Sequence, residues 1–204
     1  LGGGTAVGLS TLAGHGQMTF MLALFLGVYA LWRAAADRSL APLVLLGVVG
    51  SSGIGLAAIS LLPALEQLPH TLRAEFDIGR ASNYSLPWRG LAGLIAPDFY
   101  GRGIGRFWGD WERVEVGYAG VAPWLLALSA FAHLRQREKW FWDGAGLFFL
   151  LLALGGNTPL FGWLLSAVPV IPFQVPARFL LLTNFALAML AAFALDDWRR
   201  DPPG

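Results

Sequence analysis

The sequence predicts an all-α, polytopic transmembrane helix bundle with a long, partly structured outer loop. Hydrophobic residues make up 56% of the 204 residues, and charged residues make up only 13%. A soluble domain carries about 25% charged residues to cover its exterior, so a soluble enzyme and a disordered chain are both disfavoured. The few charges are also gathered into short segments, and they leave long stretches of the chain with none.

The charge-free stretches locate the expected spans, because a charge at the bilayer centre costs about 2.5–3.5 kcal/mol and a crossing needs about 20 apolar residues. The first stretch is interrupted by Gly14-His15-Gly16-Gln17, which predicts a truncated helix over residues 1–13. Pro63 is expected to end the second span, and Gly155-Gly156-Asn157 the fourth. The expected spans are residues 18–33, 40–62, 118–134, 140–155 (which is short) and 177–195.

Two further segments complete the single membrane domain expected over residues 1–204. The apolar run at 158–168 is too short to cross a bilayer, and it predicts a re-entrant or interfacial helix. The outer loop at 63–116 mixes six arginines and seven acids with aromatic residues. A connection of this length suggests a folded surface over the membrane, or a lid without chemistry of its own. Because the chain opens inside an apolar stretch, we expect it to be a fragment of a longer protein.

The basic residues predict the orientation of the bundle, because Lys and Arg accumulate in short cytoplasmic loops. They are found in the 33–39 loop, the 134–140 loop and the C-terminus. All three lie on the same side of the membrane if successive spans alternate in direction. Those three places are therefore expected to be cytoplasmic. The 63–116 loop and the segment Gly155–Pro176 are expected outside.

Polar residues at the predicted membrane edge are the first candidates for a binding site. His15 and Gln17 lie between two helices, where they could bind a headgroup or simply face water at a helix break. Arg178 begins the last span, where its charge opposes the helix dipole, so helix stability does not explain it. Its guanidinium could hold a phosphate through two hydrogen bonds, or it could extend toward lipid headgroups.

The outer loop supplies weaker candidates. Asp98 could be a general base, a metal ligand or an ordinary turn residue. Tyr84, in Asn83-Tyr84-Ser85, could hydrogen-bond a sugar or belong to a turn. No nucleotide-binding, zinc-protease or serine-hydrolase motif is present, and the three histidines are too scattered to predict zinc. No metal site or cofactor is predicted, although the sequence does not decide whether a divalent metal is required. A net charge of +1 gives no reason to expect nucleic-acid binding.

Several segments, taken in order, resemble the bacterial YfhO-like membrane protein family. Leu12–Gln17 resembles that family's G-H-P-Q segment, with Gly16 where the family has proline. The remaining similar segments are Ser60–Glu66, Tyr84-Ser85 with Pro87, Pro97 with Tyr100-Gly101, Tyr118–Gly120 with Pro123–Leu126, Leu154–Leu160 and Pro176–Phe179. The resemblance covers nearly the whole chain.

This resemblance implies a relative of the GT-C glycosyltransferases of the bacterial plasma membrane. Such an enzyme takes a sugar from a polyprenyl-phosphate donor and transfers it to a cell-envelope acceptor on the outer face. The family pattern implies a catalytic acid in an outer loop that would precede Leu1. In this scheme Arg178 neutralises the departing phosphate, and His15 and Gln17 hold phosphate or sugar hydroxyls. Arg73 or Arg80 would gate entry of the acceptor.

Two other classes of function fit the same sequence. One is a transporter or flippase of a lipid-linked saccharide, and the other is a non-catalytic membrane scaffold. Ion-coupled transporters place charges and broken helices at mid-membrane depth. The absence of an acid in the middle of a predicted span disfavours ion coupling, but it does not disfavour lipid scrambling.

Overall fold

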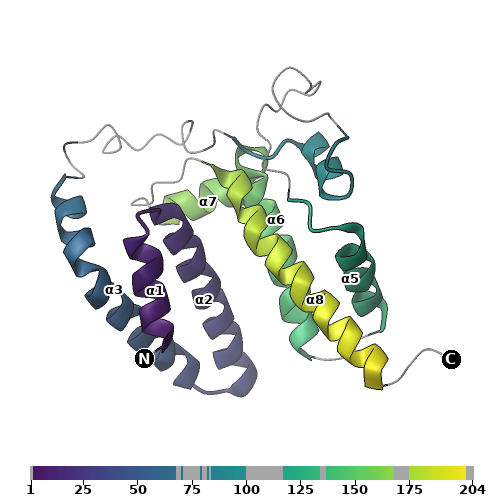
Figure 1. The fold of residues 1–204 in the computed structure, drawn as a ribbon, viewed down its shortest axis with the longest axis horizontal. Helices are drawn as coiled ribbons and strands as arrows, with labels where there is room; N and C mark the ends of the chain where they lie inside the picture. The colour runs from purple at the N-terminus through teal and green to yellow at the C-terminus, as the bar shows by residue number, and fades with distance from the viewer. Residues whose placement is uncertain are drawn as a thin grey trace. The chain divides into compact units, whose positions relative to one another are not determined.

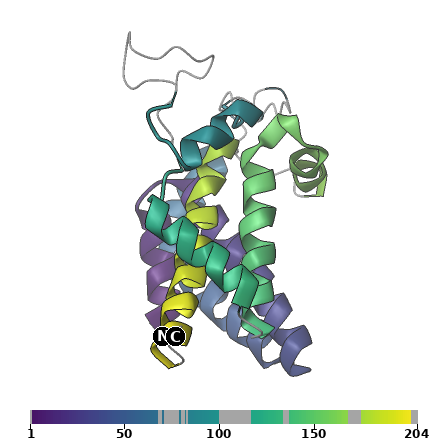
Figure 2. The ribbon, with the colours of Figure 1, turned by 90° about the vertical axis from the view of Figure 1, so that its right-hand side faces the viewer.

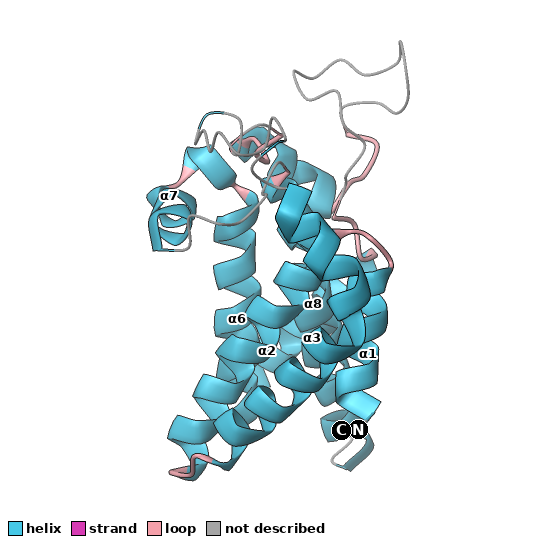
Figure 3. Cartoon of the chain, turned by 90° about the vertical axis from the view of Figure 1, so that its left-hand side faces the viewer, coloured by secondary structure: helices cyan, strands magenta, loops and turns pink. Residues whose placement is uncertain are grey.

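The computed structural model describes residues 2–67, 70, 79, 82, 84–99, 117–133, 137–167 and 175–200. Over these ranges the regular structure is entirely helical, which confirms the all-α prediction (Figure 3). The chain divides into two compact units. The first is Leu1–Asp77 with Val168–Phe173, and the second is Ile78–Ala167 with Gln174–Gly204. Each unit is described by itself.

The described part of the first unit is formed mainly by the helices α1 (Gly2–Leu12), α2 (Gly16–Asp37) and α3 (Ala41–Gln67) (Figure 1). The break between α1 and α2 falls at Gly14, whose φ of 78° suits glycine. A tight turn joins α2 to α3, with Arg38 in the left-handed conformation and its N–H bonded to the Ala34 carbonyl. The expected break is therefore present, whereas the connection expected at 33–39 is shorter, because α2 continues as a helix to Asp37 and α3 begins at Ala41.

Small residues let α1 pack closely on α3. Gly4 and Gly8 of α1 and Gly53 and Ala57 of α3 are all buried. A Cβ added to Gly8 would lie 2.9 Å from the Cβ of Leu56, and one added to Gly53 would lie 2.7 Å from a methyl carbon of Val7. Only helices without side chains at these points can approach so closely, as is typical of packing inside membranes.

The second span does not end where the sequence predicted. We expected the helix to stop at Leu62 before Pro63, but α3 continues through Pro63 to Gln67. Proline removes the hydrogen bond to the carbonyl four residues earlier, at Ile59. Here that lost bond does not break the helix, a tolerance that is common in membrane helices.

Among the residues that the structure describes, three helical segments are long and apolar enough to cross a membrane: α2 (22 residues), α3 (27 residues) and Pro176–Arg200 (25 residues). The side chains of α3 are largely exposed, with Ile59 at 81%. An apolar helix with so little of its surface covered requires a hydrocarbon solvent, so this is a membrane protein. The helices at the other two expected spans are α5 (Val121–His133) and α6 (Arg137–Ala153), and their crossing of the bilayer stays a prediction.

The second unit is built around α8 (Leu180–Arg200), which packs against both α5 and α6 (Figure 1, Figure 2). Its core is aromatic and aliphatic: Phe149, Phe161 and Phe179 have no exposed surface, and the rings of Phe149 and Phe179 stack at 6.2 Å. The described ranges of this unit also contain the short helices η2 (Trp88–Leu94), η3 (Gly155–Asn157), α7 (Pro159–Ala167) and η4 (Pro176–Phe179).

Helix α7 occupies the place of the expected re-entrant or interfacial segment at 158–168. Its nine residues span roughly 14 Å, about half of the hydrocarbon thickness of a bilayer. A short helix therefore forms where the sequence predicted one, and its place relative to the membrane stays a prediction.

Candidate functional site

The part of the outer loop that contains Tyr84 is bound between two helix ends. The N–H of Leu86 donates to the carbonyl of Ala153, at the end of α6, over 2.9 Å. The carbonyl of Tyr84 accepts from the N–H of Ala177, in η4, over 3.4 Å. Segments 84–86, 155–157 and 176–178, here called the junction, therefore lie together at the end of the unit where α6 stops and α8 starts.

Polar side chains reinforce the junction. The hydroxyl of Ser85 accepts a hydrogen bond from the N–H of Gly156 over 2.9 Å and donates its own proton to the carbonyl of Ser82. The amide nitrogen of Asn157 donates to the carbonyl of Leu86 over 2.9 Å. These bonds satisfy backbone groups that neither helix nor strand would pair, so they hold the loop in one position.

Gly155 is the point of closest approach in the junction. Its φ is 52°, and a Cβ at this position would clash with the hydroxyl of Ser85 and lie 2.8 Å from the ring of Pro176. The sequence predicted a helix end at Gly155-Gly156-Asn157, and α6 does end just before it, at Ala153. The glycine is needed both for the turn and for the contact between the outer loop and η4.

Tyr84 is held in a strained conformation. Its φ is 62°, in the left-handed region that bulky residues rarely adopt, and its side chain remains 47% exposed. Such a conformation costs of order 1–3 kcal/mol, and it persists where the surrounding contacts impose it. Strain of this kind concentrates at functional sites, which makes Tyr84 a stronger candidate than its sequence context did.

Arg178 lies in the junction on a rigid backbone. Its neighbours Ala177 and Phe179 are almost completely buried, and its own N–H donates to the carbonyl of Val175 over 3.2 Å. The Arg178 side chain is half-buried. The last span therefore does not begin as a simple α-helix at residue 177, because the single 3₁₀ turn of η4 precedes α8 and carries the arginine.

Exposed aromatic side chains surround the two ends of the second unit. Near the junction they are Tyr84, Trp88, Phe99 and Tyr118, between 40% and 57% exposed. At the other end they are Trp140 and Trp198, 63% and 43% exposed. From Leu180, the first residue of α8, to Trp198 the helix rises by about 27 Å, close to the hydrocarbon thickness of a bilayer. Aromatic groups near both ends of a membrane-spanning segment are typical of proteins that cross a bilayer.

The other predicted site residues are not brought to the junction by any described contact. Asp98 is exposed in the turn at 97–99 that follows η2. His15 is exposed just before α2, whereas Gln17 is buried, with 6% of its surface exposed. Both belong to the first unit, so their expected convergence with Arg178 stays a prediction. Arg73 and Arg80 lie outside the described residues.

Sequence reasoning missed the residues that hold the junction together. Ser85 was considered as part of a segment that could bind a sugar or form a turn, and Asn157 as part of a helix end. Each forms a hydrogen bond with a residue 71 positions away in the sequence, and a local sequence pattern cannot predict such a contact. Within the described ranges, no three His, Asp or Glu side chains lie close enough together to hold a metal ion.

No family model, curated protein or solved structure matches the chain. The resemblance to the YfhO-like family therefore rests on the short segments quoted from the sequence. Function is argued below from the site itself, because a helical membrane fold can serve many activities.

Proposed function

We propose that this chain belongs to a membrane glycosyltransferase that uses a polyprenyl-phosphate sugar donor and a cell-envelope acceptor. The observation that carries the proposal is the junction, where the carbonyl of Tyr84 bonds to the N–H of Ala177, next to Arg178. The exposed aromatic residues near this end of the second unit support placing it at the membrane interface. A lipid-linked donor has its phosphate at the interface and its chain in the bilayer. A site that recognises it must therefore offer a phosphate-binding group and a sugar-binding group at that same level.

Each of the two residues supplies one of these groups. The guanidinium of Arg178 presents paired N–H donors that fit two phosphate oxygens, and its rigid backbone limits the entropy lost on binding. The half-exposed Tyr84 offers a ring for the face of a sugar and a hydroxyl for one of its oxygens. The proposal also assigns His15 and Gln17 to phosphate or sugar hydroxyls, and Arg73 or Arg80 to acceptor entry.

The transfer proceeds by displacement at the anomeric carbon of the sugar. An acceptor hydroxyl oxygen forms a bond to that carbon while the bond from the carbon to the phosphate oxygen breaks. The bonding electrons leave with the polyprenyl phosphate, whose added charge Arg178 neutralises. The acceptor proton passes to a carboxylate base, for which Asp98 is the candidate among the described acids. The family resemblance instead implies an acid in an outer loop preceding Leu1.

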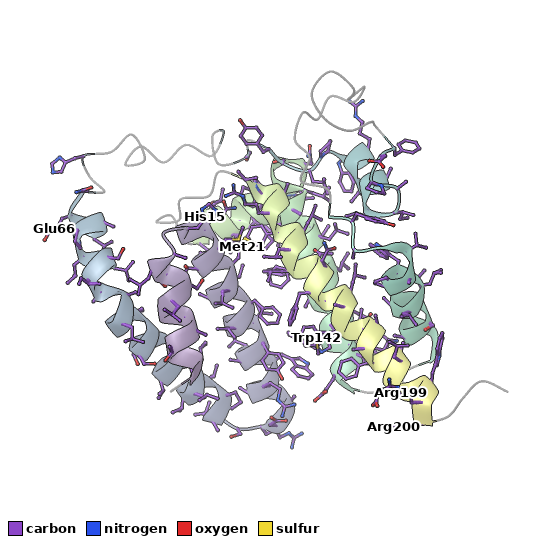
Figure 4. All side chains as sticks on the ribbon, viewed as in Figure 1. His15, Met21, Glu66, Trp142, Arg199 and Arg200 are labelled. Atoms are coloured by element: carbon purple, nitrogen blue, oxygen red, sulfur yellow. The ribbon has the colours of Figure 1, made fainter. Side chains whose placement is uncertain are left out.

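The proposed orientation puts the junction outside and the basic ends of the helices in the cytoplasm. Arg199 and Arg200 lie at the end of α8 away from the junction (Figure 4). Arg33 and Arg38 flank the turn between α2 and α3. This distribution supports a cytoplasmic location for both regions, because positive charge is retained on that side during insertion.

The test is a transfer assay with the intact gene product in proteoliposomes that contain a radiolabelled polyprenyl-phosphate sugar. Replacing Arg178 by Ala is expected to lower the rate by roughly 10²–10³, the usual cost of losing one group that stabilises developing charge. Arg178→Lys is expected to recover part of the rate. The matched control is Arg199→Ala, which removes the same charge from the other end of the same helical segment.

The outcomes separate the three classes of function. A wild-type rate in the Arg178→Ala variant, with normal membrane insertion, would remove this residue from the mechanism. Movement of the labelled lipid between leaflets without release of polyprenyl phosphate would identify a flippase instead. Neither movement nor release with the wild-type protein would favour the scaffold.

A further inference from the structure

A groove of about 440 Å³ lies in the second unit, away from the junction contacts. It forms because α8 packs on both α5 and α6, whereas α5 and α6 contact each other only sparsely. Its floor includes Ala186 and Leu190 of α8, and its sides include Leu128 of α5 and Leu147 of α6. Gly144 and Gly146 also line it and leave room that larger side chains would fill.

The groove is about as long as the hydrocarbon region of one bilayer leaflet is thick. From Trp140 to Leu150 along α6 the lining covers ten residue steps, which is roughly 15 Å of helix. Half of a bilayer's hydrocarbon core is also about 15 Å thick. The rim residues Leu128 and Leu147 are 60% and 59% exposed, so the groove is continuous with the apolar surface that the helices present to lipid.

The lining is almost entirely apolar, and its polar groups are unevenly placed. The hydroxyl of Thr183 lies within 3.5 Å of the carbonyl of Gly146. The other polar group is the carboxylate of Asp143, 3.7 Å from the ammonium of Lys139, which in turn lies 4.8 Å above the ring of Trp140. The groove therefore has one charged end, close to the start of α6. Toward Leu150 the lining is apolar apart from the Thr183 hydroxyl, which is bonded to the carbonyl of Gly146.

An amphiphile would align its own polar end with that of the groove. The polar end lies away from the junction, because α6 begins there and ends at Ala153. Its lipid would therefore come from the leaflet opposite the one that the proposed sugar donor occupies. That leaflet supplies ordinary phospholipid, and each methylene buried in the groove adds to the binding of its acyl chain.

We propose that this groove binds one acyl chain of a glycerophospholipid, with the glycerol end beside Trp140 and the Lys139–Asp143 pair. The terminal methyl group then lies near Leu150 and Thr183. A lipid in this position fills the gap between α5 and α6 and supports the packing of both on α8. The choice of a phospholipid over the sugar donor rests on the proposed function, which places the donor at the junction, whereas binding of an acyl chain in the groove rests on its lining alone.

The test uses the intact protein in vesicles of phosphatidylcholine that carries a photoreactive diazirine near the end of one acyl chain. After irradiation, peptide mapping is expected to place the label on residues 147–150 and 183–187. Gly144→Leu should lower labelling of these peptides at least fivefold, because a Cβ at Gly144 meets nothing within 4 Å and the added side chain enters the groove. Gly162→Leu in α7 is the matched control, a helical glycine with equally open surroundings outside the groove.

Three results would overturn the proposal. One is equal labelling of these peptides in the Gly144→Leu variant and the wild type. Another is wild-type label at residues 140–143, which would mean that the chain enters from the junction side. The third is displacement of the label by excess polyprenyl phosphate but not by unlabelled phospholipid, which would assign the groove to the donor. If the Gly144→Leu variant is unstable, the positions labelled in the wild type still show whether an acyl chain occupies the groove and in which direction it lies.

Discussion

Replacing Gly155 by Ala tests whether the junction is held together as the structure indicates. The φ of 52° at this position disfavours any residue with a Cβ by about 1–2 kcal/mol. The new methyl group would also lie 2.8 Å from the ring of Pro176, and such overpacking costs about 1–3 kcal/mol. Together the two effects predict a loss of roughly 2–5 kcal/mol in the free energy of unfolding, because neither neighbour can move without breaking the contacts between segments 84–86 and 176–178.

The measurement is the melting temperature in detergent micelles, followed by far-ultraviolet circular dichroism. A loss of this size corresponds to a decrease of roughly 5–15 °C for a chain of about 200 residues. The control is Gly144→Ala, a glycine inside α6 whose Cβ would meet nothing within 4 Å. That variant should gain up to about 1 kcal/mol, since alanine favours a helix interior. Equal melting temperatures for Gly155→Ala and the wild type would refute the close packing at the junction.

Three further predictions concern packing, hydrogen bonding and sidedness. Gly8→Leu should lower the free energy of unfolding by about 2–3 kcal/mol in the same melting assay, because the new side chain separates α1 from α3; Gly47→Leu, with open space around its Cβ, should not. Asn157→Ala removes one hydrogen bond of the junction, so the free energy of unfolding should fall by about 1 kcal/mol in the melting assay. An unchanged melting temperature would mean that solvent replaces the bond. The chain has no native cysteine, so an impermeant maleimide can report sidedness in intact cells: Ser166→Cys should react, and Ser39→Cys should react only after permeabilisation. The reverse pattern would invert the proposed topology.

The helical elements were predictable because they depend on local composition. Charge-free stretches of sufficient length located α2, α3 and α8, and glycines located the break at Gly14 and the end of α6. The prediction that α3 ends before Pro63 was wrong, because the effect of this proline depends on whether the helix can compensate for one lost hydrogen bond. That compensation depends on surroundings that the local pattern does not contain.

The candidate site was predictable only as separate residues. Arg178 was selected from its charge at the start of a predicted span, and Tyr84 from its chemistry within the outer loop. Their proximity follows from Gly155, Ser85 and Asn157, which bring the outer loop against two helix ends. The groove beside Gly144 was not foreseen, because it is a space left between three helices rather than a property of any one of them.

By itself, the sequence determined that the chain is helical and requires a membrane, because hydrophobicity and the scarcity of charge act along every stretch of the chain. Its basic residues also determined the orientation that we propose. Only the tertiary structure decided which segments meet at the junction and where an apolar groove remains. The physical reason is that the free energy of close packing depends on pairs of residues far apart in sequence, and a single glycine such as Gly155 decides whether two segments can touch.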